Sequence, residues 1–244
     1  MYENIEEAIN AFIEKIKKNE DYSLPDKENA DDYNCNIYNE FSLQHELGIF
    51  LRKNLTGYWK IFFEKNIYDN KKLEYDNKCP WVKKEIDLIV IKYKNSLFNN
   101  IEAKYAIELK FAKGKNARTP ENMFDFIRDI RFMEQVKEYR NFTQSFVLII
   151  VDAEKYYYNK NQYYNKKTNW IYKIFRREKN DNEEISIDIP KELDNGKRFS
   201  HPTGNKEKEK DYDNRDNFKL NRNYSTTWKK LGNNKYRYLF IEIQ

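Results

Sequence analysis

The feature that most constrains this chain is a strand-length run, Ser145–Val151, in which every residue after the serine is apolar. Successive side chains of a strand point to opposite faces, so this run must be buried on both of its faces. We therefore expect a central strand in a sheet that is flanked by helices. A chain of 244 residues is long enough to bury such a core, and residues 1–244 are predicted to form a single domain.

The spacing of apolar residues predicts the other elements. Helical periodicity predicts helices over residues 3–19, from an N-cap at Ser42 to about Leu55, and over Thr119–Arg140, with Thr119 as N-cap. Further strands are expected at Trp59–Asn66, Val82–Tyr93, Ile101–Ala112, Trp170–Arg177, Ile185–Ile189 and Tyr236–Ile243. The predicted fold class is α/β (α+β), with a central mixed sheet of four to five strands between helices and extra C-terminal strands.

Composition excludes several kinds of site. The only histidines are His45 and His201, which argues against histidine-based zinc catalysis and against a Ser-His-Asp triad. The only cysteines, Cys35 and Cys79, form no C-x-x-C motif, so a zinc ribbon is excluded. No run of about 18 apolar residues is present and the N-terminus is acidic, so we expect no membrane span, no signal peptide and a cytoplasmic location. The net charge of +5 permits a polyanionic partner.

Three charged residues interrupt otherwise apolar strands. Asp87 lies in Glu85–Ile91, and Glu108 and Lys110 lie in Tyr105–Phe111. Because side chains of a strand alternate between faces, Glu108 and Lys110 point the same way while their apolar neighbours enter the core. If the two strands are adjacent, both acids and the lysine converge on a site that can bind a divalent metal ion and activate water.

An ordinary solvated sheet face is the alternative interpretation of this E-x-K triplet, since Glu and Lys are common in the chain. Ionised groups inside a sheet are costly, however, unless they are paired or bind a metal ion. The apolar residues on either side therefore favour the metal site.

The same residues resemble the motif of the PD-(D/E)xK nuclease superfamily. Asp87 matches its first acid and Glu108-Leu109-Lys110 matches its E-x-K, whereas Ile86 stands where the motif has proline. The predicted order of helix, three strands, helix and strand is also similar to the core of restriction endonucleases. The resemblance covers about residues 42–152 and implies a restriction endonuclease-like core there, with residues 153–244 as a C-terminal elaboration.

This resemblance implies a metal-dependent endonuclease that cleaves DNA. Asp87, Glu108 and the backbone carbonyl of Leu109 would hold Mg²⁺ or Mn²⁺, which both prefer oxygen ligands. Lys110 would orient or help to deprotonate the attacking water and stabilise the transition state, and the product would carry a 5′-phosphate. Restriction-type enzymes often dimerise, so a homodimer or a partner subunit is expected.

Two helices carry further candidates. Glu46 borders the apolar stripe of the helix before the strands, where the superfamily often adds an acid. It is either a metal ligand, or a support for one, or an ordinary acid on a helix flank. In the helix after the E-x-K, Arg128, Gln135 and Tyr139 share one face, and Arg128 could meet a phosphate. Gln135–Tyr139 resembles the Q-x-x-x-Y element of the RecB-like branch, whose Gln and Tyr support the site or contact DNA, with chance similarity as the alternative.

The distal half resembles uncharacterised bacterial proteins found near restriction and phage-defence genes. The residues that carry this resemblance are Asp129-Ile130, Glu134-Gln135, Pro202-Thr203-Gly204, Tyr224 and Trp228. This resemblance implies a role in restriction or antiviral defence. Two other functions stay open: a non-catalytic DNA-binding or assembly subunit on the same fold, and a nuclease that acts on RNA. Trp228 is expected in the core, with stacking on a base as the alternative.

Overall fold

The computed structural model describes residues 1–25, 35–66, 83, 85–114, 118–158, 169–178, 184–202, 217–232 and 236–243. The helices in these ranges are α1 (Ile5–Lys18), α2 (Glu40–Asn54), α3 (Thr119–Arg140) and α4 (Asn169–Phe175), with short 3-10 turns at Glu154–Tyr156 and Asp194–Gly196. The strands are β1 (Tyr58–Asn66), β2 (Glu85–Tyr93), β3 (Ile101–Ala112), β4 (Gln144–Val151), β5 (Ile185–Ile189), β6 (Phe199–Ser200), β7 (Asn217–Phe218), β8 (Tyr224–Lys230) and β9 (Arg237–Ile243). None of the described helices is long and apolar enough to cross a membrane.

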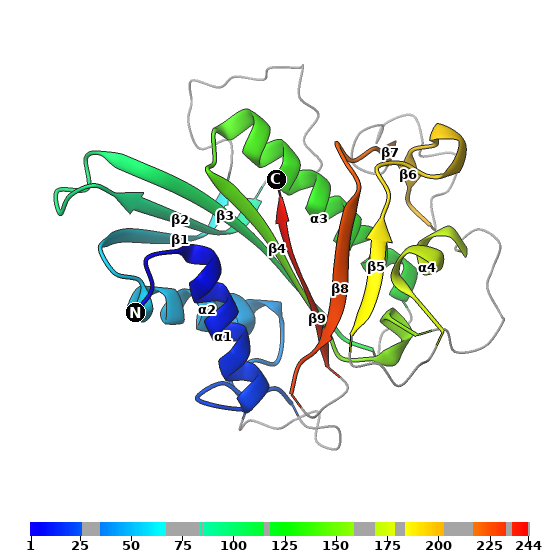
Figure 1. Ribbon diagram of the computed structural model, residues 1–244, viewed down its shortest axis with the longest axis horizontal. Coiled ribbons are helices and arrows are strands. Elements are labelled where there is room, and N and C mark those ends of the chain that lie inside the picture. Colours follow the sequence, from blue (N-terminus) through cyan, green and yellow to red (C-terminus); the bar gives the residue numbers. More distant parts are fainter. Residues whose placement is uncertain are drawn as a thin grey trace.

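Seven of the described strands form one mixed sheet in the order β1-β2-β3-β4-β9-β8-β5, and β6 forms a separate pair with β7. Within the sheet, β3 and β4 are parallel and α3 connects them, whereas the other neighbours are antiparallel. The α+β class and the mixed sheet between helices are as predicted. The sheet is wider than the expected four to five strands, because β9, β8 and β5 continue it beyond β4 (Figure 1).

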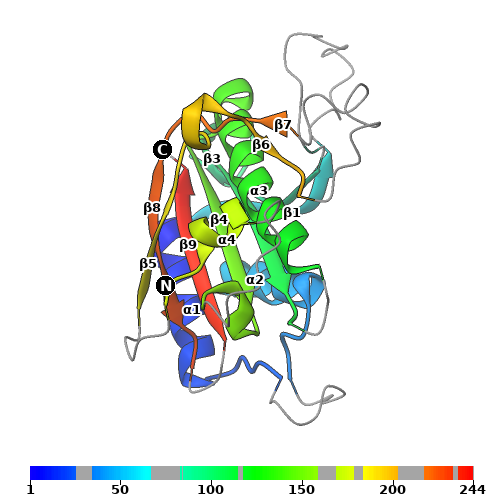
Figure 2. The same ribbon diagram turned by 90° about the vertical axis from the view of Figure 1, so that its right-hand side faces the viewer.

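Helices cover both faces of this sheet, as the apolar run predicted. The odd-numbered residues of Val147–Val151 pack in a core with α3 and α4, and the even-numbered residues of Phe146–Ile150 pack in a core with α1 and α2. Figures 1 and 2 show these two helical layers on opposite sides of the strands. All residues of β4 after Gln144 are buried, so β4 is the central strand that the sequence indicated.

Two helices start at other residues than expected. The N-cap of α2 is Asn39, whose side chain accepts a hydrogen bond from the Ser42 N–H at 2.7 Å, while the Ser42 hydroxyl accepts one from the Asn39 N–H at 2.9 Å. This capping box explains the error, because its two polar residues lie three positions apart and either one could be the cap. The earlier start places Glu40 in the first turn. Similarly, α3 follows Arg118, which makes no side-chain capping bond, and Thr119 is already helical.

The C-terminal half differs most from the sequence prediction. Most of the segment expected as a strand at Trp170–Arg177 is helix α4, because Ile171, Ile174 and Phe175 are buried at helical spacing. Strand β8 was not predicted. Its Trp228 is fully buried, and the indole N–H donates to the Phe175 carbonyl at 3.1 Å, so Trp228 belongs to the core rather than to a base-stacking surface. Residues 203 and 204 of the distal motif lie outside the described residues.

A buried carboxylate fastens α3 to the C-terminal strands. Glu134 is 3% exposed. It accepts hydrogen bonds of 2.8–3.0 Å from Arg131 Nη1, the Asn221 N–H and the Tyr224 hydroxyl. Burial raises the pKa of Glu134, and these donors oppose that shift. The bonds connect α3 with β8 and with the segment that leads into it.

Candidate functional site

The candidate site lies where β2 separates from β3. Pairing between these strands ends at Leu88 and Ile107, whereas β2 stays paired with β1 as far as Glu85. The alternation of faces along β2 is interrupted at Asp87, since Ile86 packs in the core beside α3 and Leu88 packs in the core beside α2. We call this opening between the two strands the fork. Among the described residues, no strand pairs with β3 on this side beyond Ile107.

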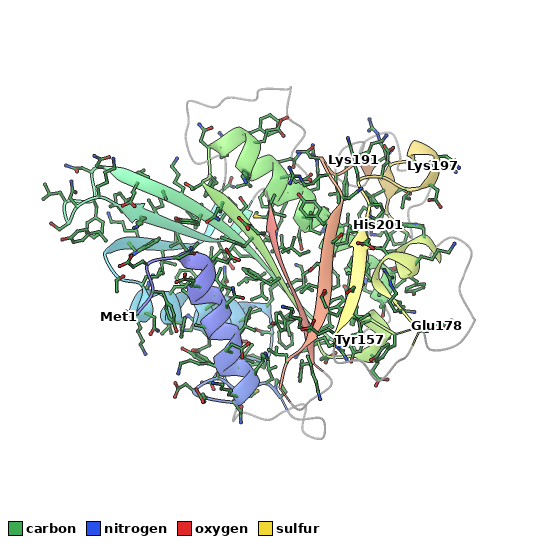
Figure 3. The ribbon with its side chains drawn as sticks, viewed as in Figure 1. Met1, Tyr157, Glu178, Lys191, Lys197 and His201 are labelled. Atoms are coloured by element: carbon green, nitrogen blue, oxygen red, sulfur yellow. The ribbon has the colours of Figure 1, made fainter. Side chains whose placement is uncertain are left out.

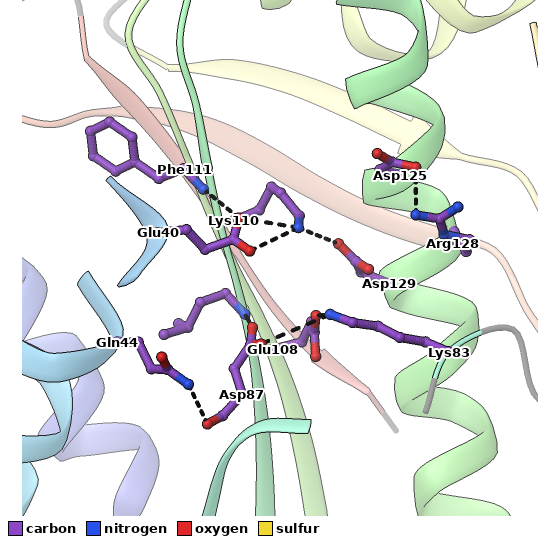
Figure 4. A network of polar contacts seen from close by, with 11 residues as sticks. Glu40, Gln44, Lys83, Asp87, Glu108, Lys110, Phe111, Asp125, Arg128 and Asp129 are labelled. Carbon is purple, nitrogen blue, oxygen red and sulfur yellow. Dashed lines mark hydrogen bonds and ion pairs between the residues drawn. The ribbon is translucent and has the colours of Figure 1, made fainter. Parts of the chain in front are cut away.

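At the fork, carboxylates accept hydrogen bonds from backbone N–H groups of β3 that a neighbouring strand would otherwise bind. The Leu109 N–H donates to Asp87 Oδ2 at 2.7 Å, and the Phe111 N–H donates to Glu40 Oε2 at 3.4 Å. Backbone N–H groups that are cut off from water need an acceptor. The fork thus fixes one acid from β2 and one from α2 along the open edge of β3 (Figure 4).

The carboxylates of Asp87 and Glu108 meet at one cation, which in this structure is Lys83. Lys83 Nζ forms an ion pair with Glu108 Oε1 and lies 3.9 Å from Asp87 Oδ1. Glu108 is fully buried, and the Asp87 side chain is 16% exposed. Burial raises the pKa of Asp87 to about 6, although the Lys83 charge and the Leu109 N–H act in the opposite direction.

Lys110 joins the two helical layers through the fork. Its Nζ lies 3.1 Å from Glu40 Oε2 on α2 and 3.7 Å from Asp129 Oδ2 on α3 (Figure 4). Burial lowers the pKa of Lys110, but the charges of Asp129 and Glu40 outweigh burial, so the pKa lies above that of an ordinary lysine. Lys110 is therefore a cation at neutral pH, able to donate hydrogen bonds but not to accept a proton.

Glu108 shows that the fork can accommodate a further cation. Its Oε2 is buried and has no hydrogen-bond partner among the described residues, which is costly for a carboxylate. Around the fork, the acids Glu40, Asp87, Glu108, Asp125 and Asp129 outnumber the cations Lys83, Lys110 and Arg128 (Figure 4). An acid-rich site with oxygen ligands suits Mg²⁺ or Mn²⁺.

The expected metal ligands are compatible with this arrangement. Asp87, Glu108 and the Leu109 carbonyl could hold an ion, with water completing its coordination. The described part of the chain has no group of three His, Cys, Asp or Glu side chains close enough to bind a metal ion by themselves. A bound ion would therefore depend on backbone and water ligands in addition to the two carboxylates, as Mg²⁺ commonly does.

Helix α2 presents Glu40 and Gln44 to the fork, and it does not bring Glu46 there. Glu40 and Gln44 lie four positions apart on one face, and the Gln44 amide donates to the Asp87 carbonyl at 2.7 Å. Glu46 lies near Tyr22, whose pKa is raised by burial and by the Glu46 charge. Glu46 was predicted from its place beside the apolar stripe, whereas Glu40 lay outside the helix as long as the helix was expected to start at Ser42.

Helix α3 brings Asp129 to the fork, and one turn before Asp129 the side chain of Asp125 pairs with Arg128, with 2.7 Å between Oδ1 and Nη2. Burial raises the pKa of Asp125, and the Arg128 charge opposes this. Gln135 and Tyr139, the other two candidates on this helix, lie further along it. Gln135 is buried and lines a separate pocket, and Tyr139 is 46% exposed.

Sequence reasoning missed Lys83, Glu40, Gln44 and Asp125, and it named Asp129 only in the distal motif, without a place in the site. Two pairs among them carry a helical signal, because each pair is spaced four residues apart. Lys83 carries no such signal. It precedes β2, and no sequence pattern shows that its ammonium group lies beside the two acids.

No family model, no curated protein and no solved structure matches this chain. Function is therefore inferred from the residues of the fork.

Proposed function

We propose that this protein is a Mg²⁺-dependent phosphodiesterase that cleaves DNA, with a restriction endonuclease-like core, and that it acts in bacterial restriction or antiviral defence in the cytoplasm. The observation that carries the proposal is the meeting of the Asp87 and Glu108 carboxylates at a single cation beside Lys110. The partnerless Oε2 of Glu108 supports the proposal, because a metal ion would satisfy it.

Each residue of the fork has a part in hydrolysis. A divalent ion held by Asp87, Glu108 and the Leu109 carbonyl would lower the pKa of bound water and offset phosphate charge. Lys110, which remains protonated, donates hydrogen bonds to the attacking water and to a phosphate oxygen, and so stabilises developing negative charge rather than acting as a base. Gln44 holds the backbone of Asp87. The oxygen of water bonds to phosphorus, the bond between phosphorus and the 3′ oxygen breaks, and a water proton goes to that oxygen, so the products are a 3′ hydroxyl and a 5′-phosphate.

The test is cleavage of supercoiled plasmid DNA, with RNA as a second substrate, in Mg²⁺, Mn²⁺ or EDTA. Asp87→Ala and Lys110→Ala should each lower the cleavage rate at least roughly 100-fold. The matched control is Glu102→Gln, which removes an acid of the same strand β3 that pairs with Lys92 away from the fork. Metal-dependent nicking that both fork variants lose and the control keeps supports the proposal. Equal cutting by the wild type and both fork variants refutes it.

The same assay separates the alternatives. DNA binding without cutting in any metal would make the protein a non-catalytic binding or assembly subunit. Cleavage of RNA but not of DNA would make it an RNA nuclease with the same fork. Sedimentation of the active protein tests the expected homodimer.

A further inference from the structure

A second polar region lies beside α3, outside the fork. It is an open pocket of about 580 Å³ between α3, the segment from β5 to β6, and β7 with the residues that follow it. Its polar lining includes Arg131, Gln135, Lys191, Arg198, Lys219 and Asn221. Figure 3 labels Lys191, which lies just beyond the end of β5.

Positive charge dominates the pocket, because Glu138 is the only acid among the described residues that line it. Two of its cations are paired with acids behind the lining: Arg131 with Glu134, and Lys219 with Glu192. Lys191 and Arg198 are exposed, and in the described part of the chain neither forms an ion pair. Lys191 and Arg198 are therefore lining cations whose charge no ion pair among the described residues neutralises.

One face of α3 connects this pocket with the fork. Arg128, Arg131 and Gln135 are spaced by three and four residues, so they form one stripe along the helix. Arg128 forms an ion pair with Asp125 on α3, next to Asp129, which contacts Lys110 of the fork (Figure 4), and Gln135 lines the pocket. At 1.5 Å per residue, the stripe from Arg128 to Gln135 is roughly 10 Å long. The phosphates of one DNA strand advance about 3.4 Å along the duplex axis per nucleotide and also wind around it, so neighbouring phosphates lie farther apart than this rise and the stripe corresponds to roughly one to two nucleotides.

We infer that the pocket binds a backbone phosphate of the DNA strand that is cut at the fork, roughly one to two nucleotides from the cleaved bond. The identity of that strand rests on the proposed function. Lys191 and Arg198 supply the charge that attracts the phosphate. Contacts of this kind position a nucleic acid without reading its sequence. The pocket therefore sets the register of the strand relative to Asp87 and Lys110.

The experiment measures binding separately from cleavage, by fluorescence anisotropy of a short labelled DNA duplex in EDTA. The double variant Lys191→Gln/Arg198→Gln changes two exposed residues, and circular dichroism confirms its fold. Its Kd should rise at least about tenfold near 0.1 M salt, and the slope of log K against log salt should become shallower by about one, because one phosphate contact is lost. The matched control Lys60→Gln/Lys94→Gln removes two exposed cations on and beside the other edge of the sheet and should change neither quantity.

The outcomes distinguish the pocket from the proposed function. An unchanged salt slope in Lys191→Gln/Arg198→Gln, with metal-dependent cleavage by the wild type, overturns the pocket and leaves the proposed function standing. Weakened binding in that variant, without cleavage by any protein, supports the pocket and overturns the proposed function. Equal weakening by the control also overturns the pocket. A labelled RNA of the same length is a second arm. Tighter binding of RNA than of DNA, lost in the same variant, overturns the assignment to a DNA strand.

Discussion

Removing the charge of Asp87 should stabilise the folded protein, although it should also abolish the proposed cleavage activity. In Asp87→Asn the side-chain oxygen can still accept the Leu109 N–H, but the fold no longer has to keep this anion buried. Burial raises the pKa of Asp87 from its ordinary 3.8 to about 6. This difference corresponds to about 3 kcal/mol of free energy of unfolding.

The direction of the effect depends on pH. Between about pH 4 and pH 6 the folded protein holds the Asp87 proton and the unfolded chain does not, so the free energy of unfolding falls as pH rises through this window. The loss is complete above the window. Asp87→Asn lacks this dependence, so near pH 8 the variant should exceed the wild type by up to about 3 kcal/mol, and below pH 4 the two should be equal.

Urea unfolding followed by circular dichroism, in EDTA across this pH range, measures the difference. The control is Asp194→Asn, the same substitution at an exposed turn, which should change the free energy of unfolding by less than about 0.5 kcal/mol at every pH. If Asp87→Asn were less stable than the wild type near pH 8, or kept the same pH slope, burial of the charged carboxylate at the fork would be refuted.

Three further predictions concern the anchor of α3, the placement of α2 and the cation at the fork. Glu134→Ala should lower the free energy of unfolding by about 3–5 kcal/mol, because it leaves buried donors without an acceptor. Glu138→Ala, which is exposed on the next turn, should lower it by less than about 1 kcal/mol in the same urea titration, and similar losses would contradict the role of Glu134. Glu40→Gln should slow plasmid cleavage roughly tenfold, because it weakens an ion pair at the fork. The control Glu46→Gln should leave the cleavage rate unchanged, and equal effects of the two substitutions would contradict the placement of α2. Lys83→Met should tighten Mn²⁺ binding in calorimetry at least roughly tenfold, because it removes an ammonium from between the two acids; weaker binding would show that Lys83 supports the ion.

The core of the fold was predictable because its signals are local. The apolar run in β4 requires cover on both faces whatever the rest of the chain does. Alternation along β3 correctly placed Ile107, Leu109 and Phe111 in the core and put Glu108 and Lys110 together on the other face.

The remaining features depend on relations between distant segments. No local pattern around Asp87 predicts that pairing between β2 and β3 ends at Leu88. This separation leaves the N–H groups of Leu109 and Phe111 without a strand partner, so Asp87 and Glu40 accept hydrogen bonds from them. The extent of the sheet depends on β9 pairing with β4, which a local pattern cannot specify. The aromatic and β-branched residues of α4 have a high strand propensity, which favoured the prediction of a strand. The segment is helical, because its buried residues are spaced as on one face of a helix.

The position of β9 has a consequence for how the protein is made. β9 lies between β4 and β8 in the sheet, although it is synthesised after both of them. Until residues 237–243 have emerged from the ribosome, β4 presents an open edge with apolar side chains on both faces, the kind of edge that pairs with other chains. The two halves of the sheet can be joined only after β9 has been made, so the open edge of β4 is the place where we expect an incomplete chain to aggregate.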